Sequence, residues 1–393
     1  MMITIFLFIS VVFFATFVLG KLIEKVKIPW IFASLVVGIL LAIYNPFAAI
    51  TNSPEFMFLS ELGMYFLLFI IGFELDLSKL RKMGPFILKS TFFIILFEAF
   101  FGSLIMRFFF GYDWIISIIV ALSFATVGEA ILVPVLDEFR IINTKLGQSI
   151  ISIGSLDDII EVAIFLLVII LVGGKAELTN LRIGTTILSM LFLFLLTFGL
   201  TKLGKRRVKF SFQKIETLFV FILFVFFLFL AIGQYAHASA VAALLAGIAI
   251  RTFVPNERLK FVDSELKTMC YGFFAPMFFI SVGLSTNIQY LLAAPLMVAL
   301  VVLVSSIAKI LASVIAGRKE LGLKDAILLG TGLSVRFSTS IIVVKILLDG
   351  GIIGRDIYSI IVASSIVFGF VVPILFANLV VRWKINRQKA LGA

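Results

Sequence analysis

The chain has 393 residues, of which 62% are hydrophobic and only 14% are charged, and its mean hydropathy is +1.21. Apolar usage in soluble domains is nearer to half, so the composition excludes a soluble globular protein and predicts a polytopic membrane protein. The net charge of +11 does not indicate nucleic-acid binding, because the basic residues lie in short loops between apolar runs. The single cysteine and single histidine exclude an internal disulfide and metal clusters built from these residues.

A membrane-spanning helix needs about 20 largely apolar residues, and thirteen such runs are predicted. They cover residues 3–20, 28–44, 56–74, 86–107, 113–136, 147–172, 183–203, 215–233, 236–253, 270–286, 292–316, 324–347 and 357–381. No small-residue cleavage site follows the first run, so we expect a retained helix rather than a signal peptide.

The loops between these runs predict the orientation of the chain in its membrane. Most of the 33 Lys and Arg residues fall on one side, which is cytoplasmic by the positive-inside rule. We therefore expect the N-terminus outside and the C-terminus in the cytoplasm.

Three runs contain sequences that favour an interruption. The fifth run carries Thr126-Val127-Gly128-Glu129, the tenth carries Ala275-Pro276, and the twelfth carries glycine and hydroxyl residues from 330 to 339. Unwound backbone at membrane depth is tolerated only where it lines a cavity or is buried in protein. The fifth and twelfth runs are the middle members of two three-run sets that begin on opposite sides of the membrane, so we predict an inverted repeat.

Ionisable residues inside predicted spans are costly, and they usually mark ion paths or proton relays. Seven lie near the middle of the predicted spans: Glu98, Glu129, Asp157, Asp158, Glu161, Lys309 and Arg336. Asp157 and Asp158 are adjacent in the sixth run. Asp157 and Glu161 share a helix face, whereas Asp158 points about 100° away from Asp157.

The two aspartates are expected to differ in role. Lys309 lies in the eleventh run, at a position equivalent to the sixth, and an Asp157–Lys309 pair would be structural, part of proton coupling, or both. The sequence assigns no partner to Asp158 in this arrangement, so we expect it to bind the transported ion. Competition between a proton and a metal cation for one carboxylate is enough to build an exchanger.

The other polar residues have structural and functional interpretations. Glu129 and Arg336 lie in the two interrupted runs and are expected to neutralise each other. Glu161 is either an accessory carboxylate or the partner of a polar neighbour, and Glu98 is expected to pair with a polar group of its own helix. Four hydroxyls can supply oxygens to a cation or serve only in helix packing: Thr126, Ser155, Ser338 and Thr339.

Five motifs in chain order carry a resemblance to a known family. They are the segment 67–77, the segment 123–128, Asp157-Asp158, Ala275-Pro276-Met277-Phe278-Phe279 with Gly283-Leu284, and Lys309. Together they resemble the monovalent cation:proton antiporter superfamily, specifically bacterial sodium/proton antiporters of the NapA type and their potassium-efflux relatives. The match extends over nearly the whole chain.

The resemblance implies an all-α polytopic NhaA/NapA-like fold with 13 transmembrane helices, inverted repeats and two crossed discontinuous helices. It implies a homodimer in which a mobile core moves like an elevator against a dimerisation panel. The panel would be residues 1–82 and 215–290, the core 83–175 and 291–393, and the linker helix 176–214. By position, Asp158 would be the main cation ligand, and Asp157 would pair with Lys309 when the ion is absent.

The chain departs from its relatives at two points. Relatives often carry Pro-Arg-Gly-Glu in the twelfth helix, where this chain has Val335-Arg336-Phe337-Ser338. Glu129 is expected to supply the missing counter-charge, and Glu161 is an additional carboxylate. Ion selectivity and stoichiometry are therefore open at this stage.

The sequence favours a secondary antiporter that exchanges protons for Na⁺, with Li⁺ as a further substrate and electrogenic exchange implied by the Asp-Asp pair. K⁺/H⁺ exchange is the alternative, followed by a gated cation channel and by sodium-coupled symport of an organic anion. The expected partners are Na⁺ and H⁺, with Li⁺ or K⁺, membrane lipid and a second copy of the chain. We expect a role in pH homeostasis, no enzymatic activity, no cofactor, no nucleotide and no nucleic acid.

Overall fold

The computed structural model describes residues 2–25, 29–75, 84–173, 180–205, 215–235, 238–254, 256–336, 338–383 and 385. The secondary structure of this part of the chain is entirely helical. Seven of these helices are long and apolar enough to cross a membrane, and four shorter apolar helices accompany them. The predicted number of thirteen spanning helices stays a prediction.

The chain forms two compact units, and each is interrupted in sequence. The first unit comprises residues 1–18, 33–75 and 169–284, and the second comprises 19–32, 76–168 and 285–393.

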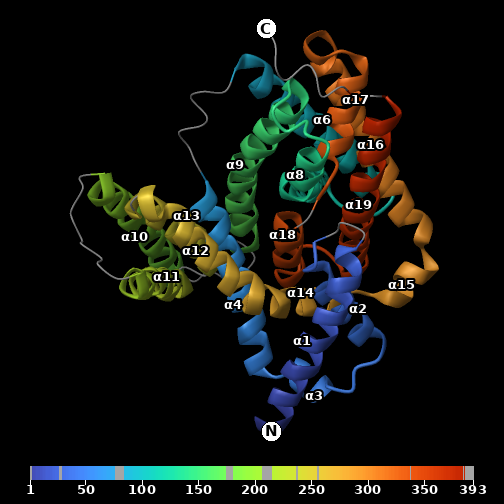
Figure 1. The fold of residues 1–393 in the computed structure, drawn as a ribbon. Coiled ribbons are helices and arrows are strands. Elements are labelled where there is room, and N and C mark those ends of the chain that lie inside the picture. Colours follow the sequence, from blue (N-terminus) through green and yellow to red (C-terminus); the bar gives the residue numbers. More distant parts are fainter. Residues whose placement is uncertain are drawn as a thin grey trace. The chain divides into compact units, whose positions relative to one another are not determined.

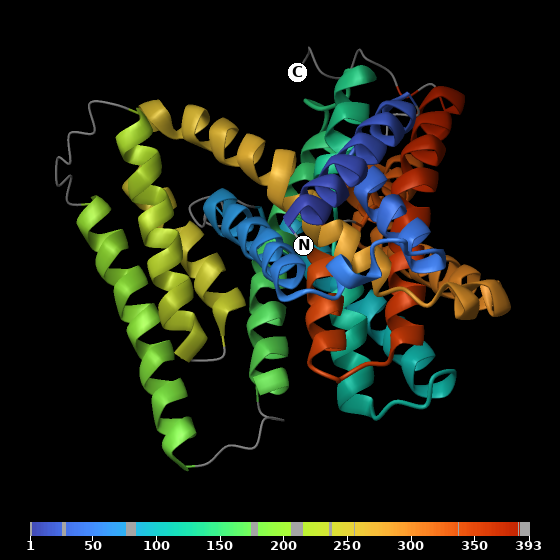
Figure 2. The ribbon, with the colours of Figure 1, turned by 90° about the horizontal axis from the view of Figure 1, so that it is seen from below.

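Close helix packing organises the first unit. It contains most of α1 (Met2–Glu24), α2 (Phe32–Ile43), α3 (Ala48–Thr51), α4 (Pro54–Glu74), α10 (Asn180–Lys205), α11 (Ile215–Tyr235), α12 (Ser239–Phe253), α13 (Asn256–Met269) and α14 (Ala275–Leu284). Figure 2 shows α10, α11 and α12 side by side. A Cβ atom on Gly72 would lie 2.1 Å from the Leu244 carbonyl oxygen, so α4 and α12 touch backbone to backbone.

The predicted interruption at Ala275-Pro276 is wrong. The chain stays helical from Asn256 to Leu284, and a π-helical turn at Cys270–Phe274 directly precedes α14. Proline cannot donate the backbone hydrogen bond of a continuous α-helix. A wider turn just before Pro276 accommodates this loss without unwinding the chain.

The second unit contains the two interruptions that matter for the site (Figure 1). Its helices are α6 (Pro85–Phe108), α7 (Trp114–Phe124), α8 (Glu129–Glu138), most of α9 (Lys145–Gly173), α15 (Ile288–Ala293), α16 (Pro295–Leu321), α17 (Leu323–Leu333), α18 (Ser338–Asp349) and α19 (Arg355–Arg382). The fifth predicted span is thus divided into α7 and α8, and the twelfth into α17 and α18. The two breaks meet, because the Gly128 amide donates a hydrogen bond of 2.7 Å to the Val335 carbonyl oxygen.

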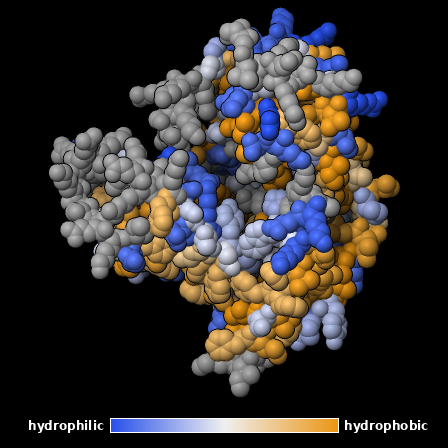
Figure 3. All heavy atoms as spheres, viewed as in Figure 1, coloured by the Kyte–Doolittle hydropathy of each residue, from blue (hydrophilic) through white to orange (hydrophobic). Residues whose placement is uncertain are grey.

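Helix α16 carries apolar residues on its exposed side and polar residues on its buried side, as a membrane-spanning helix requires. Its exposed side carries a stripe with a spacing of four residues: Leu303, Ile307, Leu311 and Ile315. Figure 3 shows hydrophobic surface over this helix. Its buried side carries Ser305, Lys309 and Ser313, so the polar groups face the protein and the apolar groups face the surroundings.

The α16–α17 contact generates a stability prediction. A Cβ atom on Gly330 would lie 2.5 Å from the Ile310 Cα atom, whereas one on Gly317 would have no neighbour closer than 3.6 Å. Gly330→Ala should lower the free energy of unfolding by about 1–3 kcal/mol through overpacking. Gly317→Ala should leave it unchanged or raise it by up to about 1 kcal/mol, the usual helix preference for alanine.

Thermal unfolding of the two purified variants in the same detergent measures this difference. Equal melting temperatures for Gly330→Ala and Gly317→Ala would show that α17 does not pack on α16 at Gly330.

Candidate ion-binding site

Lys309 joins the two interrupted helices. Its ammonium group is fully buried and donates hydrogen bonds of 2.8 Å to the carbonyl oxygens of Thr126 and Leu333. Leu333 is the last residue of α17, and Thr126 lies two residues after the end of α7. Carbonyl groups at helix C-termini lack partners within the helix and carry partial negative charge. A buried cation at this point therefore satisfies one carbonyl group at each of the two breaks.

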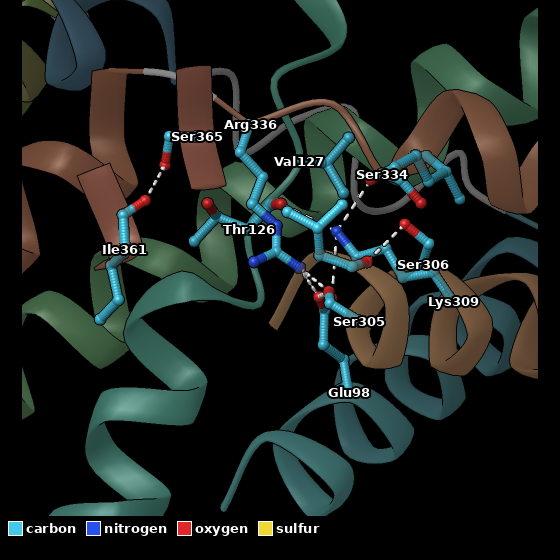
Figure 4. Close-up of polar contacts among 12 residues, drawn as sticks. Glu98, Thr126, Val127, Ser305, Ser306, Lys309, Ser334, Arg336, Ile361 and Ser365 are labelled. Atoms are coloured by element: carbon cyan, nitrogen blue, oxygen red, sulfur yellow. Dashed lines mark hydrogen bonds and ion pairs between the residues drawn. The ribbon is translucent and has the colours of Figure 1, made fainter. Parts of the chain in front are cut away.

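Glu98 of α6 is the carboxylate that balances this cation. Its Oε2 atom lies 3.1 Å from the Lys309 Nζ atom, and both side chains are buried. Its Oε1 atom forms an ion pair with Arg336, which follows α17 in the second break. The Ser305 hydroxyl contacts both Glu98 and Arg336, as Figure 4 shows. One buried carboxylate thus bridges two buried cations.

The Arg336 guanidinium is fixed from a further side by an aromatic ring. Its central carbon lies 4.6 Å from the centre of the Phe368 ring in α19. A desolvated cation over an aromatic face gains electrostatic energy, which offsets part of the cost of burial.

Asp157 of α9 holds the start of the other half of the first interrupted helix. Its Oδ2 atom accepts a hydrogen bond of 2.7 Å from the Val127 amide, two residues before α8 begins. A negative charge is favoured at a helix N-terminus. At the break between α7 and α8, a cation therefore contacts the Thr126 carbonyl group and an anion contacts the Val127 amide.

Three carboxylates of α9 interact electrostatically. Glu161 is buried, and the charges of Asp157 and Asp158 act on it. The Thr126 and Thr339 hydroxyls hydrogen-bond to the Glu161 carboxylate. Its Oε1 atom has no hydrogen-bonding partner in the described part of the chain.

The predicted Asp157–Lys309 ion pair is not the arrangement in this structure. The carboxylate partner of Lys309 is Glu98, and Lys309 acts on Asp157 only at longer range. The expectation that Glu98 pairs with a polar group of its own helix is wrong as well, because its partners come from α16 and the second break. The presence of two basic residues at membrane depth was the signal that could have assigned Glu98 to them.

The remaining predicted site residues have mixed outcomes. Thr126 is buried beside Lys309 and Glu161, while Asp158 and Ser155 are partly exposed on α9. The side chains of Glu129 and Ser338 lie outside the described part of the chain, so the Glu129–Arg336 pairing stays a prediction.

The described ionisable groups of the cluster include more carboxyl groups than cations. Four carboxylates, those of Glu98, Asp157, Asp158 and Glu161, stand against the cations of Lys309 and Arg336. Neighbouring carboxylates in a desolvated environment repel one another. A proton or a small cation relieves this repulsion, so the two can compete for the same carboxylates.

The bridging role of Glu98 generates a double-mutant prediction. Glu98→Gln should cost about 3–5 kcal/mol of stability, because it leaves two buried cations without their carboxylate. Adding Arg336→Gln should recover part of this loss, with a coupling energy of about 1–3 kcal/mol in thermal or denaturant unfolding.

An exposed ion pair of the same unit is the matched control. Lys145 and Glu320 lie 2.8 Å apart, and both side chains are at least half exposed. The double-mutant cycle of this exposed pair should give a coupling energy of about 0–1 kcal/mol. Equal coupling in the two cycles would contradict the buried bridge.

Comparison with known proteins assigns the chain to a family. Residues 9–382 match the family model described as "Sodium/hydrogen exchanger, transmembrane". The chain is 27% identical to "Probable Na(+)/H(+) antiporter 3" of Methanocaldococcus jannaschii, covering 98% of this chain and 97% of that protein. It is also 27% identical to the "Na(+)/H(+) antiporter" of Enterococcus hirae, covering 92% and 94%.

A solved structure shares the fold. The sodium proton antiporter MjNhaP1 from Methanocaldococcus jannaschii aligns with a TM-score of 0.68 at 14% identity, over 96% of this chain and 99% of that one. The predicted resemblance to cation:proton antiporters and the prediction of an integral membrane protein are confirmed. The chain belongs to the sodium/hydrogen exchanger family of transmembrane proteins.

Proposed function

We propose that the protein is a secondary antiporter that exchanges H⁺ for Na⁺, with Li⁺ as a further substrate. The observation that carries this proposal is the buried excess of carboxylates beside two helix breaks that meet. Backbone at such breaks lies at membrane depth only where protein or a cavity surrounds it. The names of the two similar proteins support Na⁺ as the exchanged ion.

Asp158 is the proposed main cation ligand, with Asp157 as the second carboxylate. Asp158 is partly exposed while Asp157 is buried, so Asp158 is the member of the pair that an ion reaches from water. Two hydroxyls are proposed to contribute: Ser155 lies three residues before Asp158 on α9, and Thr126 precedes Val127, whose amide donates to Asp157. Among the described residues no three acidic, histidine or cysteine side chains are placed to hold a metal ion together, so backbone, hydroxyl and water oxygens complete the proposed shell.

The pairing of Lys309 bears on the stoichiometry. Glu98 is the carboxylate in direct contact with Lys309 in this structure, whereas the Asp157 charge acts on Lys309 from a longer distance. Asp157 therefore loses no direct contact with Lys309 when it binds a proton. We infer an exchange of two protons for one Na⁺, which moves net charge across the membrane.

The second compact unit contains every described member of the cluster, so we propose that this unit carries the ion. An elevator-type movement would expose the cluster to each side of the membrane in turn. The first unit is the proposed dimerisation panel of a homodimer. The proposed setting is a bacterial cytoplasmic membrane, with the N-terminus outside, the C-terminus inside and a role in pH homeostasis.

Purified protein in proteoliposomes with an imposed pH gradient tests the exchange. Na⁺ and Li⁺ should dissipate the gradient, and Asp158→Asn should reduce this dissipation by at least about ten-fold, because it removes the carboxylate for which ion and proton compete. Asp137→Asn is the control, since Asp137 is an exposed acid of α8 in the same unit. Clamping the membrane potential should accelerate exchange if two protons move for each Na⁺.

Three results would contradict the proposal. Dissipation by K⁺ but not by Na⁺ would make the protein a K⁺/H⁺ antiporter. Rapid cation flux without proton movement would make it a channel. Full activity of Asp158→Asn would remove Asp158 from the ion site.

A further inference from the structure

The second unit has a cavity that is separate from the charged cluster. It lies between the start of α6 and the end of α16 and has a volume of about 590 Å³. Its lining includes Phe86, Lys89, Phe93, Ile315 and Lys319. The wall is mainly apolar, with two lysines at one end of the helix pair.

The position of the cavity along the helices places it at a membrane surface. Both α6 and α16 are long and apolar enough to cross a membrane. Lys89 lies one turn inside the start of α6, and Lys319 lies in the last turn of α16. Lysines at the ends of spanning helices extend toward the interface between hydrocarbon and water. Arg318 and Lys324 mark this end as the basic side, which is cytoplasmic by the positive-inside rule.

The charge at the cavity is positive. Glu320 also contributes to the lining, but its carboxylate is bound by Lys145 at 2.8 Å. Neither Lys89 nor Lys319 forms an ion pair with a residue that the structure describes. Among the described residues, the cavity therefore presents two ammonium groups without a carboxylate partner to an occupant.

Ser90 provides an independent sign of a ligand. It lines the cavity and is fully buried, and its hydroxyl has no hydrogen-bonding partner in the described part of the chain. Buried hydroxyls are almost always hydrogen-bonded, so an orphan hydroxyl at a cavity wall indicates a missing oxygen-bearing partner.

Two apolar stripes continue from the cavity toward the middle of the helices. On α6 the exposed residues Phe92, Leu96 and Phe100 repeat every four positions, and Phe92 lines the cavity. On α16 the stripe that ends at Ile315 begins at Leu303. A molecule with its polar end between the lysines would find a continuous apolar path for hydrocarbon chains.

We propose that this cavity is a binding site for one anionic phospholipid. Lys89 and Lys319 hold the phosphate, the Ser90 hydroxyl donates to a phosphate or ester oxygen, and the acyl chains follow the two stripes. Anionic lipid is concentrated in the cytoplasmic leaflet, where the basic end of this unit lies. The lipid spans α6 and α16, the helices that carry Glu98 and Lys309, and so stabilises the pair that bears the charge bridge.

Lipid binding by the full-length purified protein tests the proposal directly, without reference to transport. Native mass spectrometry and thermal unfolding are measured with phosphatidylglycerol and with phosphatidylcholine of identical acyl chains. Phosphatidylglycerol should bind more tightly and raise the melting temperature more. Lys89→Gln/Lys319→Gln should weaken its binding by about five-fold for each lysine lost.

Two further variants make the result specific. Lys25→Gln/Lys324→Gln removes the same charge from exposed positions outside the cavity and should bind phosphatidylglycerol like the parent protein. Lys89→Arg/Lys319→Arg keeps the charge and should keep the lipid preference. This variant distinguishes loss of binding through loss of charge from loss of binding through misfolding. Equal binding of the two lipids, equal loss in both glutamine variants, or loss in the arginine variant would overturn the proposal. Failure of Na⁺/H⁺ exchange would leave this site unaffected.

Discussion

The contact on which the second unit depends is the buried ammonium group of Lys309 on the carbonyl oxygens of Thr126 and Leu333. Two helices that end inside an apolar environment leave carbonyl groups that water cannot satisfy. A single cation satisfies one carbonyl group at each break, and it contacts Glu98, the carboxylate that it shares with Arg336. The breaks and the charges therefore support each other: the cation satisfies a carbonyl group at each break, and these carbonyls give Lys309 two acceptors besides Glu98.

The chemistry of the site follows from the carboxylates that are not in contact with Lys309 or Arg336. Glu98 is occupied by Lys309 and Arg336, and the Asp157 carboxylate accepts the Val127 amide. The carboxylates of α9 then interact with one another, and protons or small cations are the partners that reduce their repulsion. The helix breaks thus bring the charged groups together, and the carboxylates that remain are the ones proposed to exchange ions.

Sequence reasoning could predict the class of protein, a cluster of charges inside the helical part of the chain, and the two breaks. Glycine and hydroxyl residues at 126–128 and 330–339 are poor helix formers at membrane depth, and the helices end there. The partner of Lys309 was not predictable in the same way. Spacing along a helix gives the depth of a residue but not the direction in which its neighbours present their side chains, so Asp157 and Glu98 were indistinguishable at the level of sequence. The π-helical turn before Pro276 was missed because an expected helix break and a widened turn share the same proline signal.

The central claim is that Na⁺ and protons compete for the carboxylates of α9. Equilibrium binding of isotopic Na⁺ to purified protein across a pH series, with released protons counted in weakly buffered solution, tests it without transport. The account predicts that Na⁺ affinity falls as the pH is lowered and that each Na⁺ bound releases protons. Na⁺ binding that does not change with pH and releases no protons would contradict it.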